Sequence, residues 1–205
     1  KKTHSQTLLP MLEELSKMIE LDLNSIDAIA VSQGPGSFTG LRIGSATAKG
    51  LGLALDKPII PVPTVDALAF NLWGTDKLVC PLMDARRQQA YTGLYTFEDG
   101  KLHTVVPQCV VDISEVVAEV NKQGREVIFL GDGVPVYGKL LKEGLKIPYS
   151  FAPAHVNRQS AAAVGALGMR YFLEGKIESA KEHQPDYLRL SQAERERAEK
   201  NANIS

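Results

Sequence analysis

The sequence predicts an α/β protein in which short buried strands alternate with amphipathic helices. Runs such as 28–31 are apolar on both faces, which is typical of strands buried in a parallel sheet. Turn residues end these runs, and segments with helical spacing of apolar residues follow several of them. With 44% hydrophobic and 23% charged residues, the composition excludes a coiled-coil rod and a mainly disordered chain.

The first part of the chain opens on a helix and then repeats the order of strand and helix. An apolar stripe at Leu8, Leu12, Leu15 and Ile19 marks this opening helix. Pro58 ends a later helix, because proline cannot continue it. After the opening helix we predict a strand at 28–31, a helix at 41–55, a strand at 59–62, a helix at 65–73 and a strand at 78–83. We interpret these as βαβ units.

The second part continues with a hairpin and further pairs of strand and helix. Partial alternation at 89–97 indicates a strand with one wetter face, and the turn at 98–101 pairs it with the next strand. Pro107 is expected to separate that strand from another one. The remaining predictions are strands at 102–106, 109–111 and 127–130, and helices at 114–122, 136–142 and 160–173.

Length, charge and cysteine content limit the classes of function. At about 150 residues per domain, 205 residues correspond to one large or two small domains. A net charge of -1 lacks the cationic excess of a free-standing nucleic-acid binder, so any RNA contact is expected to be local or shared with a partner. Cys80 and Cys109 are interpreted as buried thiols of a reducing compartment. The sequence has no apolar run of membrane-spanning length, and we expect a cytoplasmic protein.

A glycine-rich segment from Gly34 to Gly40 has two interpretations. A glycine loop between strand and helix can bind phosphate, but this one has neither P-loop nor dinucleotide spacing. The alternative is a tight turn with close helix packing. The small residues Gly40, Gly44, Ala48 and Gly52 recur every fourth position, which favours a helix–helix interface within or between subunits.

The other polar motifs give weaker signals. Asp84–Arg87 follows an apolar strand, so it is either an anion or partner contact or a charged turn. Tyr187–Arg189 is either a docking strand or the end of the fold. No two histidines lie closer than 28 positions, and therefore no local metal-binding motif is present. We assign no catalytic, cofactor-binding or metal-binding residue.

Four motifs in order resemble the TsaB (YeaZ) family. They are the opening Thr3–Ser5 before an apolar helix, the run Ser32–Gly44, the run Met83–Arg87 followed by Tyr91, and the run Pro185–Arg189. The resemblance implies an actin-like ATPase fold (ASKHA, ribonuclease H-like) with two α/β lobes, and further β-strands before Lys1. We expect an N-terminal lobe at 1–98, a C-terminal lobe at 99–190 and a charged flexible tail at 191–205.

The resemblance also implies a function. It is that of a non-catalytic subunit in the formation of threonylcarbamoyladenosine beside the anticodon of tRNA. Implied partners are a TsaD-type transferase subunit, a TsaE-type ATPase, a second copy when alone, and tRNA only through the complex; no cofactor is implied. Alternatives are an actin-like ATPase or a glycoprotease-type metallopeptidase acting alone. The expected partner interface consists of Leu8, Leu12, Leu15, Phe38, Gly40, Arg42, Gly44 and Ala48.

Overall fold

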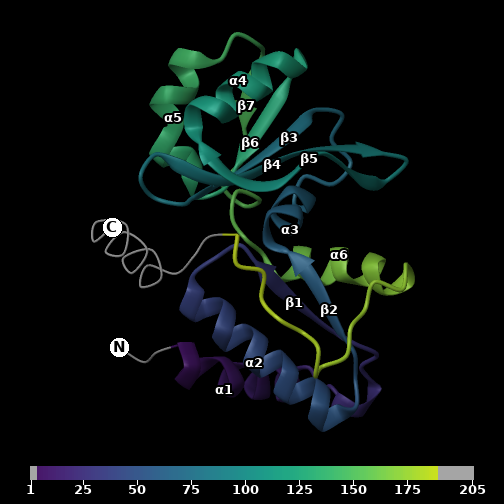
Figure 1. Cartoon of the computed structure of the whole chain (residues 1–205). Helices are drawn as coiled ribbons and strands as arrows, with labels where there is room; N and C mark the ends of the chain where they lie inside the picture. The colour runs from purple at the N-terminus through teal and green to yellow at the C-terminus, as the bar shows by residue number, and fades with distance from the viewer. Residues whose placement is uncertain (1–3, 189–205) are drawn as a thin grey trace, which may run out of the picture.

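The computed structural model describes residues 4–188 (Figure 1). Residues 1–3 and the predicted tail at 191–205 therefore lie outside the described residues. The elements in chain order are α1 His4–Met18, the 3-10 turn η1 Leu23–Ser25, β1 Ile29–Gly34, α2 Phe38–Leu55, β2 Ile59–Pro63, α3 Thr64–Phe70, β3 Leu78–Asp84, β4 Gln89–Glu98, β5 Lys101–Asp112, α4 Ile113–Gln123, β6 Val127–Leu130, α5 Gly133–Gly144, β7 Tyr149–Phe151 and α6 Ala161–Leu173.

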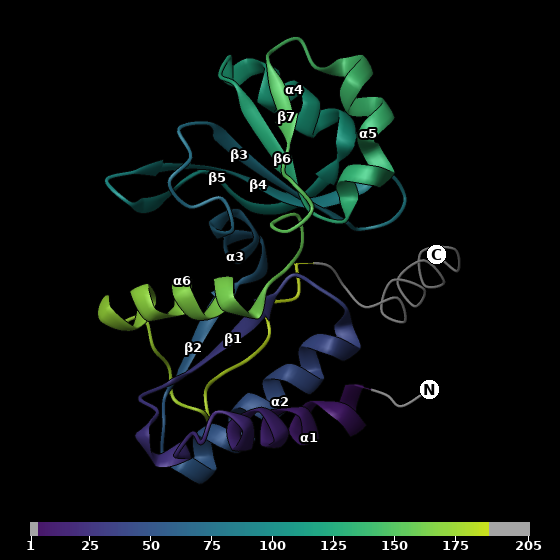
Figure 2. The same cartoon turned by 180° about the vertical axis from the view of Figure 1, so that it is seen from behind.

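The strands of residues 4–188 form two separate sheets, with one lobe around each of them (Figures 1 and 2). The first lobe consists of the two-stranded parallel sheet β1-β2 with α1, α2 and α6. The second lobe consists of the five-stranded sheet β5-β4-β3-β6-β7 with α4 and α5. Helix α3 lies between the lobes. This arrangement confirms the predicted fold of two α/β lobes.

In the first lobe, helices cover both faces of the small sheet. Val31 points to the α2 side, whereas Ala30 points to α6, because successive side chains of a strand face opposite ways. A β-carbon on Gly168 of α6 would lie only 2.7 Å from that of Ala30. Glycine at this position therefore allows α6 to approach the sheet closely.

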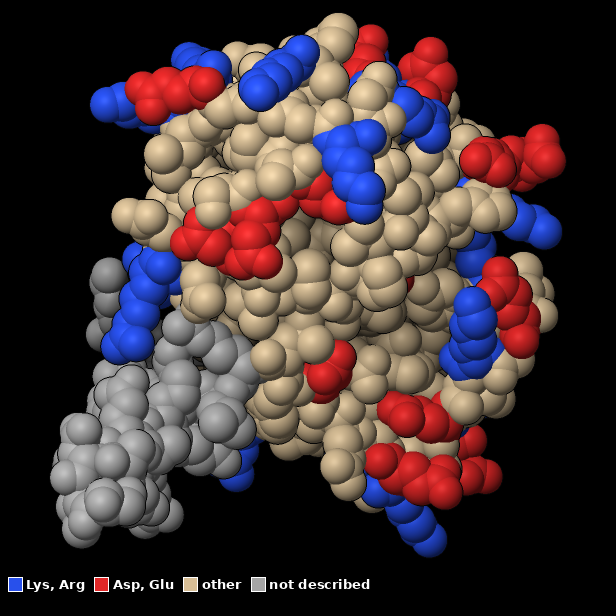
Figure 3. All heavy atoms as spheres, turned by 45° about the horizontal axis from the view of Figure 1, so that its top comes forward, with Lys and Arg blue, Asp and Glu red and all other residues tan. Residues whose placement is uncertain are grey.

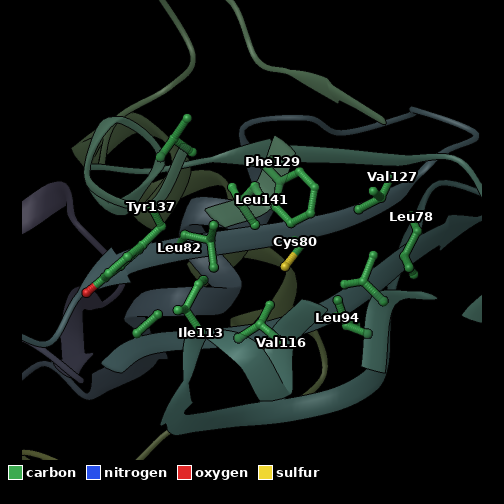
Figure 4. Packing of buried hydrophobic residues seen from close by; sticks show 13 residues of the cluster. Leu78, Cys80, Leu82, Leu94, Ile113, Val116, Val127, Phe129, Tyr137 and Leu141 are labelled. Carbon is green, nitrogen blue, oxygen red and sulfur yellow. The ribbon is translucent and has the colours of Figure 1, made fainter. Parts of the chain in front are cut away.

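In the second lobe, a single apolar layer lies between the sheet and the two helices (Figure 4). Cys80 of β3 and Phe129 of β6 are fully buried against Val116 of α4 and Leu141 of α5. Burial raises the pKa of the Cys80 thiol to about 12, so this thiol stays protonated. The prediction of a buried thiol is confirmed for Cys80, whereas Cys109 on β5 is half-buried.

Strand pairing corrects the predicted division after residue 98. Strands β3 and β4 pair with β6 and β5, so they belong to the second lobe, and a boundary at 98 would cut the β4–β5 hairpin. Helix α6, which we placed in the C-terminal lobe, packs on β1 and β2. The chain thus leaves the first lobe through α3 and returns to it after β7.

Two local predictions are also wrong. The predicted strands at 102–106 and 109–111 are one strand, β5, because β5 is at the sheet edge, where the missing N–H of Pro107 is tolerated. Its pairing with β4 shifts register between Val106 and Cys109, around that proline. The segment β2-α3-β3 is not a βαβ unit, because β2 and β3 belong to different sheets.

Candidate partner-binding surface

Helix α1 carries an exposed apolar face on the outside of the first lobe. It lies along α2, and both helices are away from the second lobe (Figures 1 and 2). The side chains spaced for one side of the helix are Leu8, Met11, Leu12, Leu15 and Met18, which we call the α1 face. Met11 is 64% exposed and Leu15 is 53% exposed. Because large apolar side chains gathered in this way are uncommon on a monomer surface, we take the α1 face as the candidate interaction surface.

The predicted interface residues on α2 divide into two groups. Ala48 is only 4% exposed and packs with Ile59 and Ala180 inside the first lobe. Gly44 faces β1, because a β-carbon on this glycine would lie 4.0 Å from the Val31 side chain. The small-residue stripe therefore serves close packing within the subunit, which is one of the two alternatives that the sequence left open. Gly40, in contrast, is exposed at the start of the helix.

Phe38, Arg42 and Tyr187 form a cluster at the first turn of α2, which we call the aromatic cluster. The Phe38 ring lies 4.8 Å from the Tyr187 ring, measured between centroids, and the Arg42 guanidinium lies 5.6 Å from the centre of the Phe38 ring. Ser37 caps the helix, since its hydroxyl accepts a hydrogen bond from the Gly40 N–H. Tyr187 thus packs within the molecule, at the edge of the surface that α1 and α2 present.

The glycine loop is closed by the C-terminal strap, which we define as residues 174–188. The Asp186 N–H donates to the Gln33 carbonyl at 2.8 Å. Gly34 has φ +133°, and a β-carbon there would lie 2.2 Å from the Asp186 carbonyl oxygen. Gln108 of β5 donates to the Asp186 carboxylate, so the strap also contacts the second lobe. This packing accounts for the glycine at position 34 and favours the tight-turn interpretation.

An apolar groove of about 810 Å³ follows the open edge of β1. Leu8 and Leu12 border it from α1, Gly44 and Ala48 from α2, and Val164 from α6. Strand β1 pairs with β2 on one side and has no second neighbour among the strands of residues 4–188. The groove therefore separates the two helical layers where the sheet of the first lobe ends.

The motif at Asp84–Arg87 forms the turn between β3 and β4. Arg86 and Arg87 both have positive φ and are exposed, and the Arg86 guanidinium lies 3.4 Å from the Asp84 carboxylate. Burial acts to raise the pKa of Asp84, but hydrogen bonds from the Tyr137 hydroxyl and the Arg86 N–H outweigh it and lower the pKa. The arrangement supports a charged turn with an ion pair, and both arginines remain at the surface.

Two polar groupings have no signal in the sequence. Asp66 contacts Tyr95 and Tyr171, which are 29 and 105 positions away. His183 is fully buried in the strap and contacts Glu178 through its Nδ1 atom. Side chains that are so far apart in the sequence, or that an irregular segment brings together, form no recognisable sequence motif. Residues 4–188 contain no group of three or more side chains that could hold a metal ion.

Charged residues are mixed over the surface. In the view of Figure 3, lysines and arginines stand near aspartates and glutamates around a largely uncharged face. This mixture agrees with the net charge of -1 and gives no extended basic surface on the face shown. Within residues 4–188, no helix has the length and apolar character that a membrane span requires.

The proteins to which this chain is similar are named for the same tRNA modification. Residues 1–197 match the family model of TsaD, tRNA N6-adenosine threonylcarbamoyltransferase. The tRNA threonylcarbamoyladenosine biosynthesis protein TsaB of Bacillus subtilis is 36% identical over 198 residues, which are 95% of this chain and 83% of that protein. The protein of the same name from Escherichia coli is 30% identical over 91% of this chain and 80% of its own length.

A solved structure agrees with these relatives. YeaZ from Pseudomonas aeruginosa superposes with a TM-score of 0.76 at 26% identity, over 91% of this chain and 84% of that one. The two-lobed α/β fold and the motifs at Ser32–Gly44 and Met83–Arg87 thus occur in a chain whose relatives carry the names TsaB and YeaZ. The chain belongs to the TsaB (YeaZ) family of tRNA threonylcarbamoyladenosine biosynthesis proteins, within the group that the TsaD family model describes.

Proposed function

We propose that this chain is the non-catalytic subunit that binds and supports a TsaD-type transferase in the formation of threonylcarbamoyladenosine on tRNA. The observation that carries the proposal is the exposed α1 face beside α2. Two neighbouring helices with an apolar outer face can pair with two helices of a partner to form a bundle. The aromatic cluster of Phe38, Arg42 and Tyr187 lies at the edge of this surface.

The same proposal assigns the remaining partners. A TsaE-type ATPase joins the pair of subunits, and tRNA is bound through the complex, since a net charge of -1 supplies little electrostatic affinity for phosphates. In the absence of the transferase subunit, the α1 face pairs with a second copy about a two-fold axis, because an isologous dimer buries the same apolar patch on both molecules.

A charge placed on the α1 face tests the interface. We expect Met11→Glu combined with Leu15→Glu to weaken binding to the TsaD-type subunit about 100-fold, because two exposed apolar contacts are replaced by carboxylates that would be buried. Isothermal titration calorimetry with the purified subunit measures this affinity. The matched control is Leu173→Glu, which changes a 77% exposed leucine on α6, across the sheet from α2.

The outcome separates the interface from a general effect of charge. An unchanged affinity of the double variant, or an equal loss in Leu173→Glu, would contradict the proposed surface. The role itself is tested by reconstituted threonylcarbamoyl transfer to tRNA with and without this subunit. Full activity in its absence removes the proposed role, and turnover of ATP by the chain alone would support an independent ATPase instead.

A further inference from the structure

Helix α3 packs against both lobes. Val65, Leu68 and Ala69 pack against the sheet of the second lobe. Ala67 and Phe70 pack with β2 and α6 of the first lobe, and the Phe70 ring also contacts that of Phe97 on β4. Apolar residues on different sides of the helix therefore pack against the two lobes, and a residue placed between these sides can contact both.

Asp66 occupies such a position in the first turn of α3. Its Oδ1 atom accepts a hydrogen bond of 2.6 Å from the Tyr95 hydroxyl, and Tyr95 is a fully buried residue of β4 in the second lobe. Its Oδ2 atom accepts a hydrogen bond of 3.3 Å from the Tyr171 hydroxyl of α6 in the first lobe. One carboxylate thus receives one donor from each lobe.

The two hydrogen bonds use the acceptor capacity of a carboxylate. A carboxylate accepts hydrogen bonds on both oxygens, whereas the amide of asparagine accepts on only one side. Burial and the Asp66 carboxylate raise the pKa of Tyr95 and of Tyr171, so both hydroxyls keep the proton that they donate. Burial also raises the pKa of Asp66 itself, whereas the two tyrosine hydroxyls and the Lys176 ammonium act in the opposite direction and favour the carboxylate.

The second connection between the lobes contacts the end of the same helix. The Asn71 side chain, directly after α3, donates to the carbonyls of Val156 and Arg158. These residues lie in the segment that leads from β7 to α6. Asn157 of that segment accepts from the Gly131 N–H at the end of β6. Both connecting segments are therefore held by polar side chains around α3.

We propose that Asp66 is an interlobe latch, which holds Tyr95 and Tyr171 together so that the two lobes open as one cooperative unit. A two-stranded sheet is marginal by itself, so the first lobe depends on this coupling more than the five-stranded second lobe does. None of the three residues belongs to the α1 face, and the latch is independent of the partner surface.

Native-state hydrogen exchange of the full chain tests the latch, because it reports the opening of each segment separately. In the unaltered protein, we expect the slowest amides of β2 and α6 and those of β3 and β6 to have the same protection. Tyr171→Phe removes one hydroxyl without changing the shape of the side chain, and Asp66→Asn removes one acceptor. Both variants are expected to lower protection in β2 and α6 at least tenfold more than in β3 and β6.

The matched control is Tyr137→Phe, which also removes a hydroxyl that donates to a carboxylate, that of Asp84, but within the second lobe. It is expected to lower protection in β2 and α6 no more than in β3 and β6. Equal losses in both lobes for Tyr171→Phe and Asp66→Asn would overturn the proposal. Unequal protection of the lobes in the unaltered protein, or the same first-lobe loss in Tyr137→Phe, would overturn it as well.

Discussion

At the end of β3, Tyr137 and Asp84 form a polar contact whose contribution to the free energy of unfolding is expected to depend on pH. The Tyr137 hydroxyl lies 2.7 Å from Asp84 Oδ1 and 2.7 Å from the Gln89 carbonyl oxygen. Tyr137→Phe removes a hydrogen bond to a charged group and is expected to lower the free energy of unfolding by about 2 kcal/mol at neutral pH. Urea unfolding measures this difference.

The sign of the pH dependence follows from the lowered pKa of Asp84. A carboxyl group with a lowered pKa in the folded state contributes stability above its ordinary pKa, and this contribution is lost as the pH falls through the folded pKa. The difference between the unaltered protein and Tyr137→Phe is therefore expected to shrink below about pH 4, the ordinary pKa of aspartate. A difference that stays constant down to about pH 2 would show that Asp84 does not contribute through its charge.

Gly34 and Gly50 differ in what a side chain would meet. A β-carbon at Gly34 would collide with the strap, at a φ that side chains rarely adopt, whereas Gly50 is exposed on α2 with nothing within 4 Å. Gly34→Ala is expected to cost about 3 kcal/mol in the free energy of unfolding, and Gly50→Ala to add about 0.5–1 kcal/mol. Thermal and urea unfolding compare the two, and equal stability of the variants would contradict the close approach of Asp186.

At the scale of elements, hydrophobic spacing predicts most of the helices and strands because it is a local signal. The strand at 28–31, the helix at 41–55 and the strand at 59–62 correspond to β1, α2 and β2. The three-residue strand β7 has no counterpart among the predicted strands, since so short a segment has no period. The small-residue stripe on α2 is visible in the sequence, but its packing partners, β1 and Ala180, follow from tertiary contacts alone.

Within residues 4–188, β1 is an edge strand whose second side has no neighbouring strand. An unpaired edge between two helical layers, with an apolar groove beside it, suits a further strand that is apolar on both faces. If such a strand is added to the sheet, the groove beside Leu8 and Leu12 is the place that its side chains would fill.

At the scale of the whole molecule, the sequence predicts two lobes but not their boundary. The pairing of β3 with β6 and the packing of α6 on β1 join segments far apart in the chain, and no local pattern encodes such pairings. The partner surface stays a prediction, which the exposed α1 face beside α2 and the family resemblance support. Met11 and Met18 are exposed but are not among the interface residues that the sequence predicts. Ala48 is among them but is buried, and only the structure shows this difference in exposure.

The oligomeric state of the chain on its own can be predicted from the α1 face. In isolation the chain is expected to sediment as a homodimer, and the combined variant Met11→Glu and Leu15→Glu as a monomer, because the α1 face is the apolar surface that the dimer would bury. Analytical ultracentrifugation distinguishes the two masses. Addition of the TsaD-type subunit should convert the homodimer to a heterodimer, and a homodimer that persists in the double variant would place the contact elsewhere.

The path of the chain between the lobes also sets an order of assembly during synthesis. The strands and helices of the second lobe all lie between Leu78 and Phe151, so this lobe can complete its core while the ribosome is still adding α6. The first lobe cannot cover its sheet until α6 has emerged and Glu178 of the strap has paired with Ile59 of β2. The first lobe, whose helix α1 is synthesised first, is therefore expected to complete its folding after the second lobe.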